Sequence, residues 1–195
     1  MVMEEIEAYA KKYQVPIMEP DGIAFLTNYV KEHEEIKHIL EIGCAIGYSA
    51  IQMALVREEI QITTIERDEK RYLEAIKNIK AFHLEDRITV LFQDAFDVTL
   101  EESFDLIFID AAKSQYIKFF EKFTPLLTEH GVVVSDNLNF HGLTFTKEHI
   151  DSRNVRQMVR KIRSYIDYLK SLENYHTDFY EVGDGIGVTK KRSME

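Results

Sequence analysis

The chain has 195 residues, enough for one domain of ordinary size, and 45% of them are hydrophobic while 30% are charged, as in folded proteins. Lys and Arg number 24 against 34 Asp and Glu, and the resulting net charge of −10 excludes a protein that binds nucleic acid indiscriminately through a positive coat. The single cysteine, Cys44, excludes an intrachain disulfide and predicts a reducing, cytoplasmic location. No apolar run approaches the ~20 residues that span a bilayer, so we expect no membrane partner.

Residues 1–35 predict a helical cap, which together with a core of residues 36–195 forms a single domain. A short helix runs to Tyr13, and the prolines of Val15–Pro20 predict an extended connector. Apolar residues then recur at helical spacing at Ile23, Leu26 and Val30.

From His38 onward, short β-rich runs alternate with helical stretches, which is typical of parallel βαβ units. The predicted strands are His38–Ile42, Gln61–Glu66, Ile88–Phe92, Leu106–Ile109 and Val132–Ser135, and the predicted helices are Ser49–Arg57, Glu69–Phe82, Gln115–Leu127 and Arg153–Leu172. Two further strands, Thr177–Val182 and Ile186–Lys190, flank a Gly-Asp-Gly turn that indicates a hairpin. The sequence therefore predicts an α/β fold with a doubly wound, mostly parallel seven-stranded sheet that ends in an antiparallel hairpin.

A glycine loop follows the first predicted strand, where Gly43 and Gly47 bracket Cys44-Ala45-Ile46 and a helix starts at Ser49. The spacing is neither the dinucleotide G-x-G-x-x-G nor a P-loop, because no Gly-Lys-Ser/Thr follows. Without a diphosphate to bind, such a loop suits an uncharged nucleoside with an amino-acid tail. The Ser49 hydroxyl and the start of its helix are suited to bind the tail's carboxylate.

Acidic residues end the next two predicted strands. Glu66 lies about 20 residues beyond the glycine loop, where a carboxylate takes ribose hydroxyls, and Asp94-Ala95 follows the third strand, where a carboxylate meets an adenine amino group. Each alone is also an ordinary βα turn. Three such motifs at consecutive strand ends favour S-adenosylmethionine as the cofactor.

Oxygen ligands end the fourth and fifth predicted strands, in Ile109-Asp110-Ala111-Ala112-Lys113 and Ser135-Asp136-Asn137. Neighbouring parallel strands deliver their carboxyl ends to one crevice, so Asp110, Asp136 and Asn137 are expected to converge there. A set without His or Cys favours Mg²⁺ or another hard cation over zinc. Taken singly, Asp110 also reads as a helix cap and Asp136-Asn137 as a turn.

These motifs, with Val182-Gly183-Asp184-Gly185, resemble the cation-dependent class I O-methyltransferases, the family of catechol and caffeoyl-coenzyme A O-methyltransferases, which has a Rossmann-like fold. Within it, Val15-Pro16-Ile17-Met18 is most similar to the bacterial tRNA 5-hydroxyuridine methyltransferases. The resemblance covers about Ala8 to Lys191 and implies a homodimer. It implies cofactor contacts and metal ligation, with Lys113 as general base beside Asp110. The implied cofactor residues are Met18, Gly43, Ser49, Glu66, Asp94, Ala95 and Asp110, and the implied metal ligands are Asp110, Asp136 and Asn137.

The metal chemistry requires two neighbouring oxygens on the substrate, which both a catechol and 5-hydroxyuridine supply. The helix near Arg153–Leu172 is the feature that distinguishes between these substrates. Its arginines at 153, 156, 160 and 163 recur on one helical face. Such a face is either merely solvated or follows RNA phosphates. The leading hypothesis is therefore methylation of 5-hydroxyuridine at the tRNA wobble position. A small catechol-like metabolite and a non-catalytic nucleoside-binding module are the alternatives.

Overall fold

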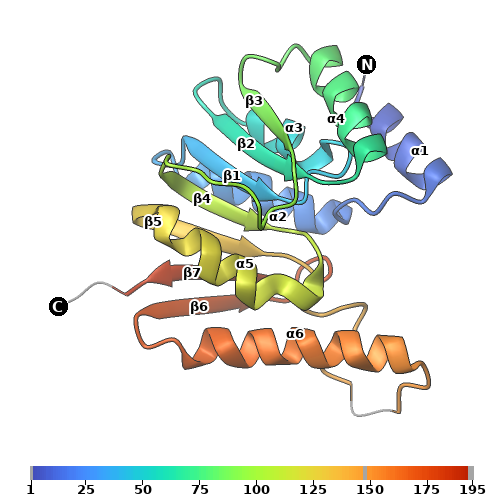
Figure 1. The fold of residues 1–195 in the computed structure, drawn as a ribbon, viewed down its shortest axis with the longest axis vertical. Helices are drawn as coiled ribbons and strands as arrows, with labels where there is room; N and C mark the ends of the chain where they lie inside the picture. Colours follow the sequence, from blue (N-terminus) through green and yellow to red (C-terminus); the bar gives the residue numbers. More distant parts are fainter. Residues whose placement is uncertain (1, 147–148, 193–195) are drawn as a thin grey trace.

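The computed structural model describes residues 2–146 and 149–192, and these form one seven-stranded sheet between two layers of helices (Figure 1). The helices are α1 (Met3–Tyr13), α2 (Pro20–Glu32), α3 (Tyr48–Ala54), α4 (Glu69–Ala81), α5 (Tyr116–Phe123) and α6 (Arg153–Ser171). The strands are β1 (His38–Ile42), β2 (Gln61–Glu66), β3 (Ile88–Phe92), β4 (Phe104–Ile109), β5 (Leu127–Ser135), β6 (Tyr175–Tyr180) and β7 (Ile186–Lys191).

The strand order is β3-β2-β1-β4-β5-β7-β6. Strands β1 to β5 pair in parallel, whereas β7 is antiparallel to both β5 and β6, so the predicted fold class and its terminal hairpin are confirmed. The parallel strands all end at the same edge, which is where an open α/β sheet binds its ligands.

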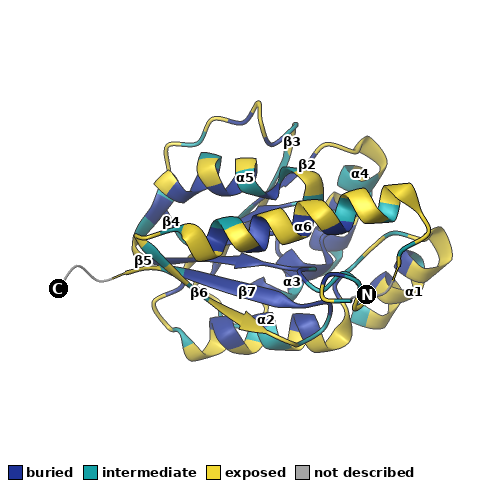
Figure 2. Cartoon of the chain, turned by 90° about the horizontal axis from the view of Figure 1, so that it is seen from below, coloured by how far each residue is buried: buried dark blue, intermediate teal, exposed yellow. Residues whose placement is uncertain are grey.

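The inner parallel strands β1 and β4 bury both faces, because their alternate residues enter two separate cores. On one face Ile39 and Phe108 pack with α1, α2 and α3. On the other face Leu40 and Ile107 pack with α5 and α6, whose buried sides face the sheet (Figure 2). The near-continuous apolar runs of the sequence are explained by this double burial.

Several predicted boundaries are wrong by a few residues. Strand β5 begins at Leu127 rather than Val132, because polar residues and Gly131 at its exposed start hide the strand pattern. Helix α5 is shorter than the predicted Gln115–Leu127, since 3₁₀ turns at Lys113–Gln115 and Thr124–Leu126 flank it. Strand β6 ends at Tyr180, because Val182 already belongs to the turn and accepts a hydrogen bond from the Gly185 amide at 2.9 Å.

The turn Val182–Gly185 joins distant parts of the chain at the ligand-binding edge. The Asn139 amide donates to the Asp184 carbonyl at 2.7 Å, and the Leu138 amide donates to the Gly185 carbonyl at 2.9 Å. A Cβ on Gly183, whose φ is +54°, would lie 3.0 Å from the backbone of Gly22 in α2. Glycine at position 183 therefore lets the last turn of the sheet pack directly on the second helix.

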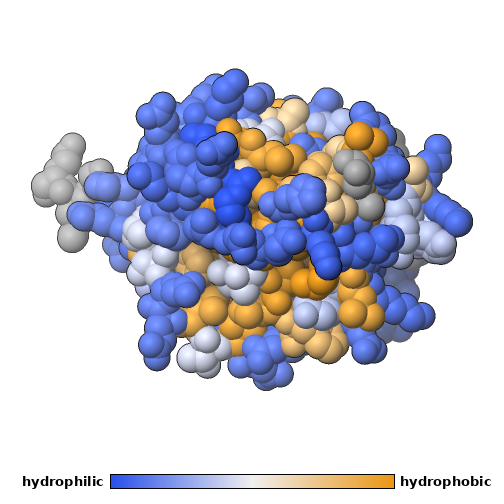
Figure 3. Space-filling view, turned by 90° about the horizontal axis from the view of Figure 1, so that it is seen from above, coloured by the Kyte–Doolittle hydropathy of each residue, from blue (hydrophilic) through white to orange (hydrophobic). Residues whose placement is uncertain are grey.

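Exposed apolar side chains gather along the outermost strand β3 and the neighbouring helix α4, on the side of the sheet away from β6. Leu73 and Ile76 of α4 and Phe92 of β3 are all more than one-third exposed, and the Tyr72 and Phe92 rings stack at 5.0 Å. Figure 3 views the molecule from this side and shows apolar surface framed by polar residues. The predicted homodimer stays a prediction. Within the described residues, no helix is long and apolar enough to cross a membrane.

Candidate active site

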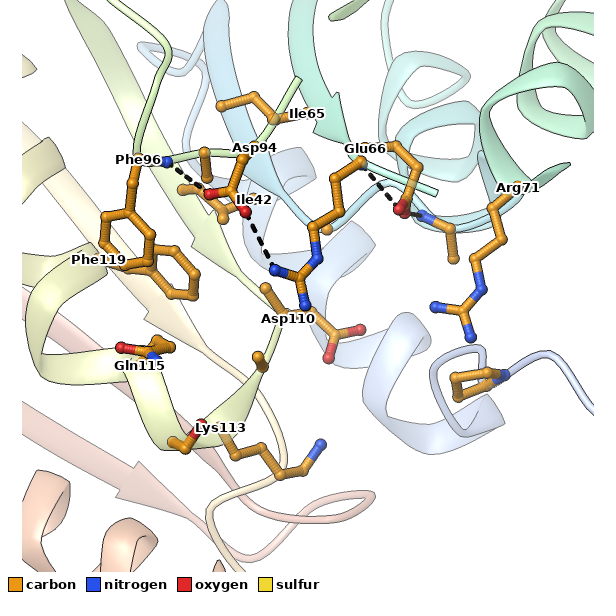
Figure 4. Close-up of a pocket in the computed structure, with 18 of the residues that line it drawn as sticks. Ile42, Ile65, Glu66, Arg71, Asp94, Phe96, Asp110, Lys113, Gln115 and Phe119 are labelled. Carbon is orange, nitrogen blue, oxygen red and sulfur yellow. Dashed lines mark hydrogen bonds and ion pairs between the residues drawn. The ribbon is translucent and has the colours of Figure 1, made fainter. Parts of the chain in front are cut away.

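A cavity of about 520 Å³ lies at the carboxyl ends of β1 to β4 (Figure 4). Pro16 and Ile17, from the connector between α1 and α2, form part of its wall. Of the residues predicted for a cofactor or a metal, six line this cavity: Gly43, Glu66, Asp94, Ala95, Asp110 and Asn137. Lys113 lines it as well.

Gly43 lies where β1 turns away from the sheet. Its φ is +102°, and a Cβ there would lie 2.2 Å from the carbonyl oxygen of Asp110. Only glycine fits both this backbone conformation and this close approach to the end of β4. Gly47, with a φ of +84°, ends the loop and starts α3.

Two predicted cofactor residues, Met18 and Ser49, do not line the cavity. The Ser49 hydroxyl is buried beneath the glycine loop and donates a short hydrogen bond to Glu41, so it is already satisfied within the protein. Met18 is 4% exposed and its Cε lies near Gly22, whereas its neighbours Pro16 and Ile17 reach the cavity.

Glu41 is a buried carboxyl group that the sequence analysis missed. It is fully buried within β1 and accepts hydrogen bonds from the hydroxyls of Ser49 and Thr64. Burial raises the pKa of Glu41 to about 7, although the two hydroxyls oppose the shift. The sequence did carry a signal for this residue, because an acid between apolar residues of a buried strand requires buried hydrogen-bond partners.

Glu66 ends β2, and three backbone amides hold its carboxylate. The Ala45 amide donates to Oε2 at 2.8 Å, while the Arg67 and Asp68 amides donate to Oε1 at 2.9 and 2.8 Å. The carboxylate is thus fixed between the glycine loop and the start of α4. At the cavity wall, it is placed to accept further hydrogen bonds from vicinal hydroxyls.

Asp94 follows β3 and already has two partners. The Phe96 amide donates to Oδ1 and Arg67 donates to Oδ2, both at 3.0 Å. The Phe96 amide, followed by the Arg67 guanidinium, holds the pKa of Asp94 below its usual value. Arg67, Arg71 and Gln115 also line the cavity, and the sequence analysis missed all three because nothing in a local pattern marks which side chains turn inward.

Asp110 lines the cavity, whereas Asp136, the predicted metal ligand that follows β5, does not. Asp136 is 2% exposed, and its Oδ1 has no hydrogen-bond partner among the residues that the structure describes. Burial raises the pKa of both carboxyls, and the Asp110 charge adds to the rise at Asp136. The nearby charge of Asp184 raises the pKa of Asp110 and of Asp136 further. Asp184 accepts a hydrogen bond from the His141 amide, and the sequence analysis did not predict it as part of this group.

These carboxyls fit a divalent cation in their chemistry, because they bring oxygen acceptors together with few donors to satisfy them. One donor in this group is the Lys113 Nζ, which donates a hydrogen bond to the Asn137 Oδ1. In the described part of the chain, no three His, Cys, Asp or Glu side chains approach closely enough to hold a metal. The predicted site has two acids and one amide, and it stays a prediction.

The predicted arginine face of α6 is only partly free. Arg156 donates to the carbonyls of Ile150 and Asp151, and Arg163 donates to those of Thr144 at 2.6 Å and Thr146 at 3.0 Å. These two arginines hold the loop that leads from β5 to α6. All four arginines are exposed, and the predicted contact with RNA phosphates stays a prediction, with Arg153 and Arg160 the two that the described residues do not engage through their guanidinium groups.

Comparisons with known proteins agree with this geometry. The model of the O-methyltransferase family matches residues 1–192. A caffeoyl-CoA O-methyltransferase from Populus kitakamiensis is 28% identical over 96% of this chain and 84% of that protein. A "putative caffeoyl-CoA O-methyltransferase" from Staphylococcus aureus is 36% identical, with a TM-score of 0.92 over 98% of this chain and 93% of that one.

An O-methyltransferase from Bacillus cereus, solved in complex with SAH, is 25% identical, with a TM-score of 0.83 over 97% of this chain and 90% of that one. The family model spans nearly the whole chain, including both glycines of the loop and all the acids of the cavity. The chain is therefore an enzyme of the O-methyltransferase family.

Proposed function

We propose that the chain transfers a methyl group from S-adenosylmethionine to a substrate hydroxyl that a divalent cation holds at Asp110, Asp136 and Asn137. The observation that carries the proposal is the buried, unpartnered Oδ1 of Asp136, whose carboxyl interacts with that of Asp110 and lies next in the chain to Asn137, two residues that line the cavity. An anionic oxygen without a donor at this depth is costly unless a cation or a proton meets it.

The cavity suits the proposed methyl donor. Because Gly43 has no side chain, the backbone at the end of β1 packs closely on Asp110 and leaves room in the cavity. Glu66 presents a fixed carboxylate for the two ribose hydroxyls. The B. cereus relative, solved in complex with SAH, supports the same class of ligand.

The cation, when bound, supplies Lewis-acid chemistry that lowers the pKa of a coordinated hydroxyl. Lys113 would take the proton from that hydroxyl, a role supported by the contact of its Nζ with Asn137. The protein's remaining task is alignment, because holding methyl donor and acceptor in line recovers on the order of 7–11 kcal/mol of the barrier.

For the substrate, we propose 5-hydroxyuridine at the tRNA wobble position, whose 5-hydroxyl and 4-carbonyl are adjacent oxygens. The support on the protein surface is the exposed pair Arg153 and Arg160, on the helix that follows the loop from Asp136 and Asn137. Arginine matches phosphate geometry and gives affinity that falls with added salt.

A small catechol-like metabolite is the second candidate. The similarity to a plant protein named caffeoyl-CoA O-methyltransferase favours it, and its two adjacent hydroxyls would suit the same cation site.

The deciding experiment is nucleoside mass spectrometry of tRNA from cells lacking the gene, after incubation with the protein, S-adenosylmethionine and Mg²⁺. We expect 5-methoxyuridine to appear, to vanish with a chelator and to decrease as salt is added. Charge reversal at Arg153 and Arg160 should raise the KM for tRNA, whereas reversal at exposed Lys31 and Lys80 serves as the matched control. Methylation of catechols alone would favour the second candidate, and full activity in the chelator would rule out the cation.

A further inference from the structure

Tyr48 is a buried side chain that directly follows the glycine loop and reaches the first helix of the chain. It is 4% exposed, and its hydroxyl donates a hydrogen bond at 2.9 Å to Oε1 of Glu7 in α1. The same hydroxyl also interacts with Gln52, one turn further along α3. Burial raises the pKa of Tyr48 to about 12, so the hydroxyl stays protonated at neutral pH and remains a donor. The end of the glycine loop is therefore attached to α1.

Helix α1 has a small apolar anchor. Its buried residues are Ile6 and Ala10, and the Lys77 Nζ of α4 lies 5.9 Å from the centre of the Tyr9 ring. Segments with little buried apolar surface open at a low cost in free energy. One hydrogen bond from the Tyr48 hydroxyl to a carboxylate therefore contributes a large share of what keeps α1 in place.

The end of α1 leads directly to the cavity wall, through the extended connector that joins it to α2 (Figure 1). The Ala10 carbonyl accepts hydrogen bonds from the amides of Gln14 and Val15, the second at 2.9 Å. These bonds make the first residues of the connector move with the helix. The next two residues, Pro16 and Ile17, line the cavity. A shift of α1 would therefore shift this part of the wall.

The wall formed by Pro16 and Ile17 is thin. A second hollow, of about 440 Å³, lies beside the connector, and Lys11 and Gln14 line it together with Pro16 and Ile17. Pro16 is itself exposed. Since the same two residues line both spaces, the wall has room to move when α1 moves.

The hydrogen bond between Tyr48 and Glu7 completes a ring of contacts around the cavity. On one side, Ala45 of the glycine loop lines the cavity, and Tyr48 follows three residues later. On the other side, the wall of Pro16 and Ile17 continues into α1, which carries Glu7. Breaking the hydrogen bond would open this ring at a point outside the cavity.

We propose that Tyr48 is a positioning residue whose hydrogen bond to Glu7 holds the wall of Pro16 and Ile17 closed against the bound methyl donor. Tyr48 does not line the cavity, so it acts through α1 and not by touching the ligand. The inference rests on the proposed cofactor, and it goes further by giving the first helix a part in retaining that cofactor.

The test is the rate at which SAH dissociates, measured by surface plasmon resonance, which requires neither metal nor methyl acceptor. Tyr48→Phe keeps the ring in the core and removes the hydroxyl, so SAH should dissociate about tenfold faster, the size of one hydrogen bond to a charged group. Tyr165→Phe in α6 is the matched control, because it also removes a buried hydroxyl that bonds a side chain, Ser135 Oγ at 2.7 Å. It should leave the dissociation rate unchanged.

The coupling between ligand and helix must also act in the opposite direction. Lys11 and Lys12 are exposed at the end of α1, where trypsin cleaves when the helix opens. Saturating SAH should slow this cleavage in the wild-type protein, and the protection should fall about tenfold in Tyr48→Phe. Cleavage after Lys161 in α6 reports unfolding of the whole chain, so a merely structural loss would accelerate cleavage in both helices equally and would overturn the proposal.

Glu7→Ala provides a second reading that stands even where Tyr48→Phe does not fold, because Glu7 is exposed on α1. It should match Tyr48→Phe and add nothing in the double variant, since both changes remove one hydrogen bond. Glu7→Gln keeps an acceptor and should restore most of the retention.

Unchanged dissociation in Glu7→Ala, or equal acceleration in Tyr165→Phe, would overturn the role of Tyr48 while leaving the proposed cofactor intact. Absence of SAH binding to the wild-type protein would overturn both.

Discussion

The hydroxyl of Ser49 donates a hydrogen bond to the carboxyl group of Glu41, beneath the glycine loop and out of solvent. Because Thr64 donates to the other oxygen, Glu41 ties β1 to β2 and to the first turn of α3. A group expected to face the cofactor therefore stabilises the loop from below, and the loop's backbone is left to face the ligand.

Replacing Glu41 with Gln should change how stability depends on pH. The pKa of Glu41 is raised to about 7 in the folded protein from its ordinary value of 4.5, so between these values the folded state holds a proton that the unfolded state has lost. Its stabilising effect is full below pH 4.5 and is lost as the pH rises through 7. Urea unfolding at pH 5 and pH 8 should therefore show Glu41→Gln gaining about 2.5 kcal/mol relative to wild type between the two conditions. If the free energies of unfolding of the two proteins change in parallel with pH, the pKa of Glu41 is not raised in the folded state.

Gly43→Ala should destabilise the protein by about 3 kcal/mol or more, because the new Cβ would lie 2.2 Å from a backbone oxygen and the φ of +102° disfavours alanine. Gly142 is the matched control. Its φ is +80°, but a Cβ there meets nothing within 4 Å, so Gly142→Ala should cost only about 1 kcal/mol. Equal losses in denaturant unfolding would show that backbone conformation alone, and not the contact with Asp110, requires glycine at position 43.

Asp136→Asn should abolish stabilisation by divalent cations. In the wild-type protein, Mg²⁺ at a hundred times its Kd should add about 2.7 kcal/mol to the free energy of unfolding, since it binds only the folded site. The same titration should leave the melting temperature of Asp136→Asn unchanged, whereas Asp167→Asn on the exposed side of α6 should respond like wild type. A cation response that survives in Asp136→Asn would place the metal elsewhere.

Lys113→Met should lower kcat by about 10²–10⁴-fold, the usual contribution of a positioned general base. The affinity for SAH should change far less, because the Lys113 Nζ contacts Asn137 rather than the ribose-binding carboxylate of Glu66. Lys118→Met, an exposed change on α5, controls for the loss of a charge nearby. If Lys113→Met instead weakens SAH binding and leaves kcat intact, Lys113 serves the cofactor and not the proton transfer.

The sequence predicts the backbone frame of the site well, for a physical reason. Parallel strands end at one edge, so residues that follow the apolar runs, such as Gly43, Glu66 and Asp110, reach the cavity without any knowledge of side-chain packing. The hydrogen bond of Ser49 to Glu41 and the place of Gln115 in the cavity wall could not be predicted, because both depend on which way a side chain turns. Arg163 could be placed on its helical face from spacing alone, but its attachment to the Thr144 carbonyl depends on the path of a loop without periodic pattern.

The contact between Gly22 and Gly183 has a consequence for any side chain at position 183. A Cβ there would lie 3.0 Å from the Gly22 backbone, so it would push the turn between β6 and β7 away from α2. The same turn accepts hydrogen bonds from the Leu138 and Asn139 amides, directly after Asp136 and Asn137. A substitution at Gly183 is therefore expected to disturb the predicted metal ligands from outside the cavity, through the backbone alone.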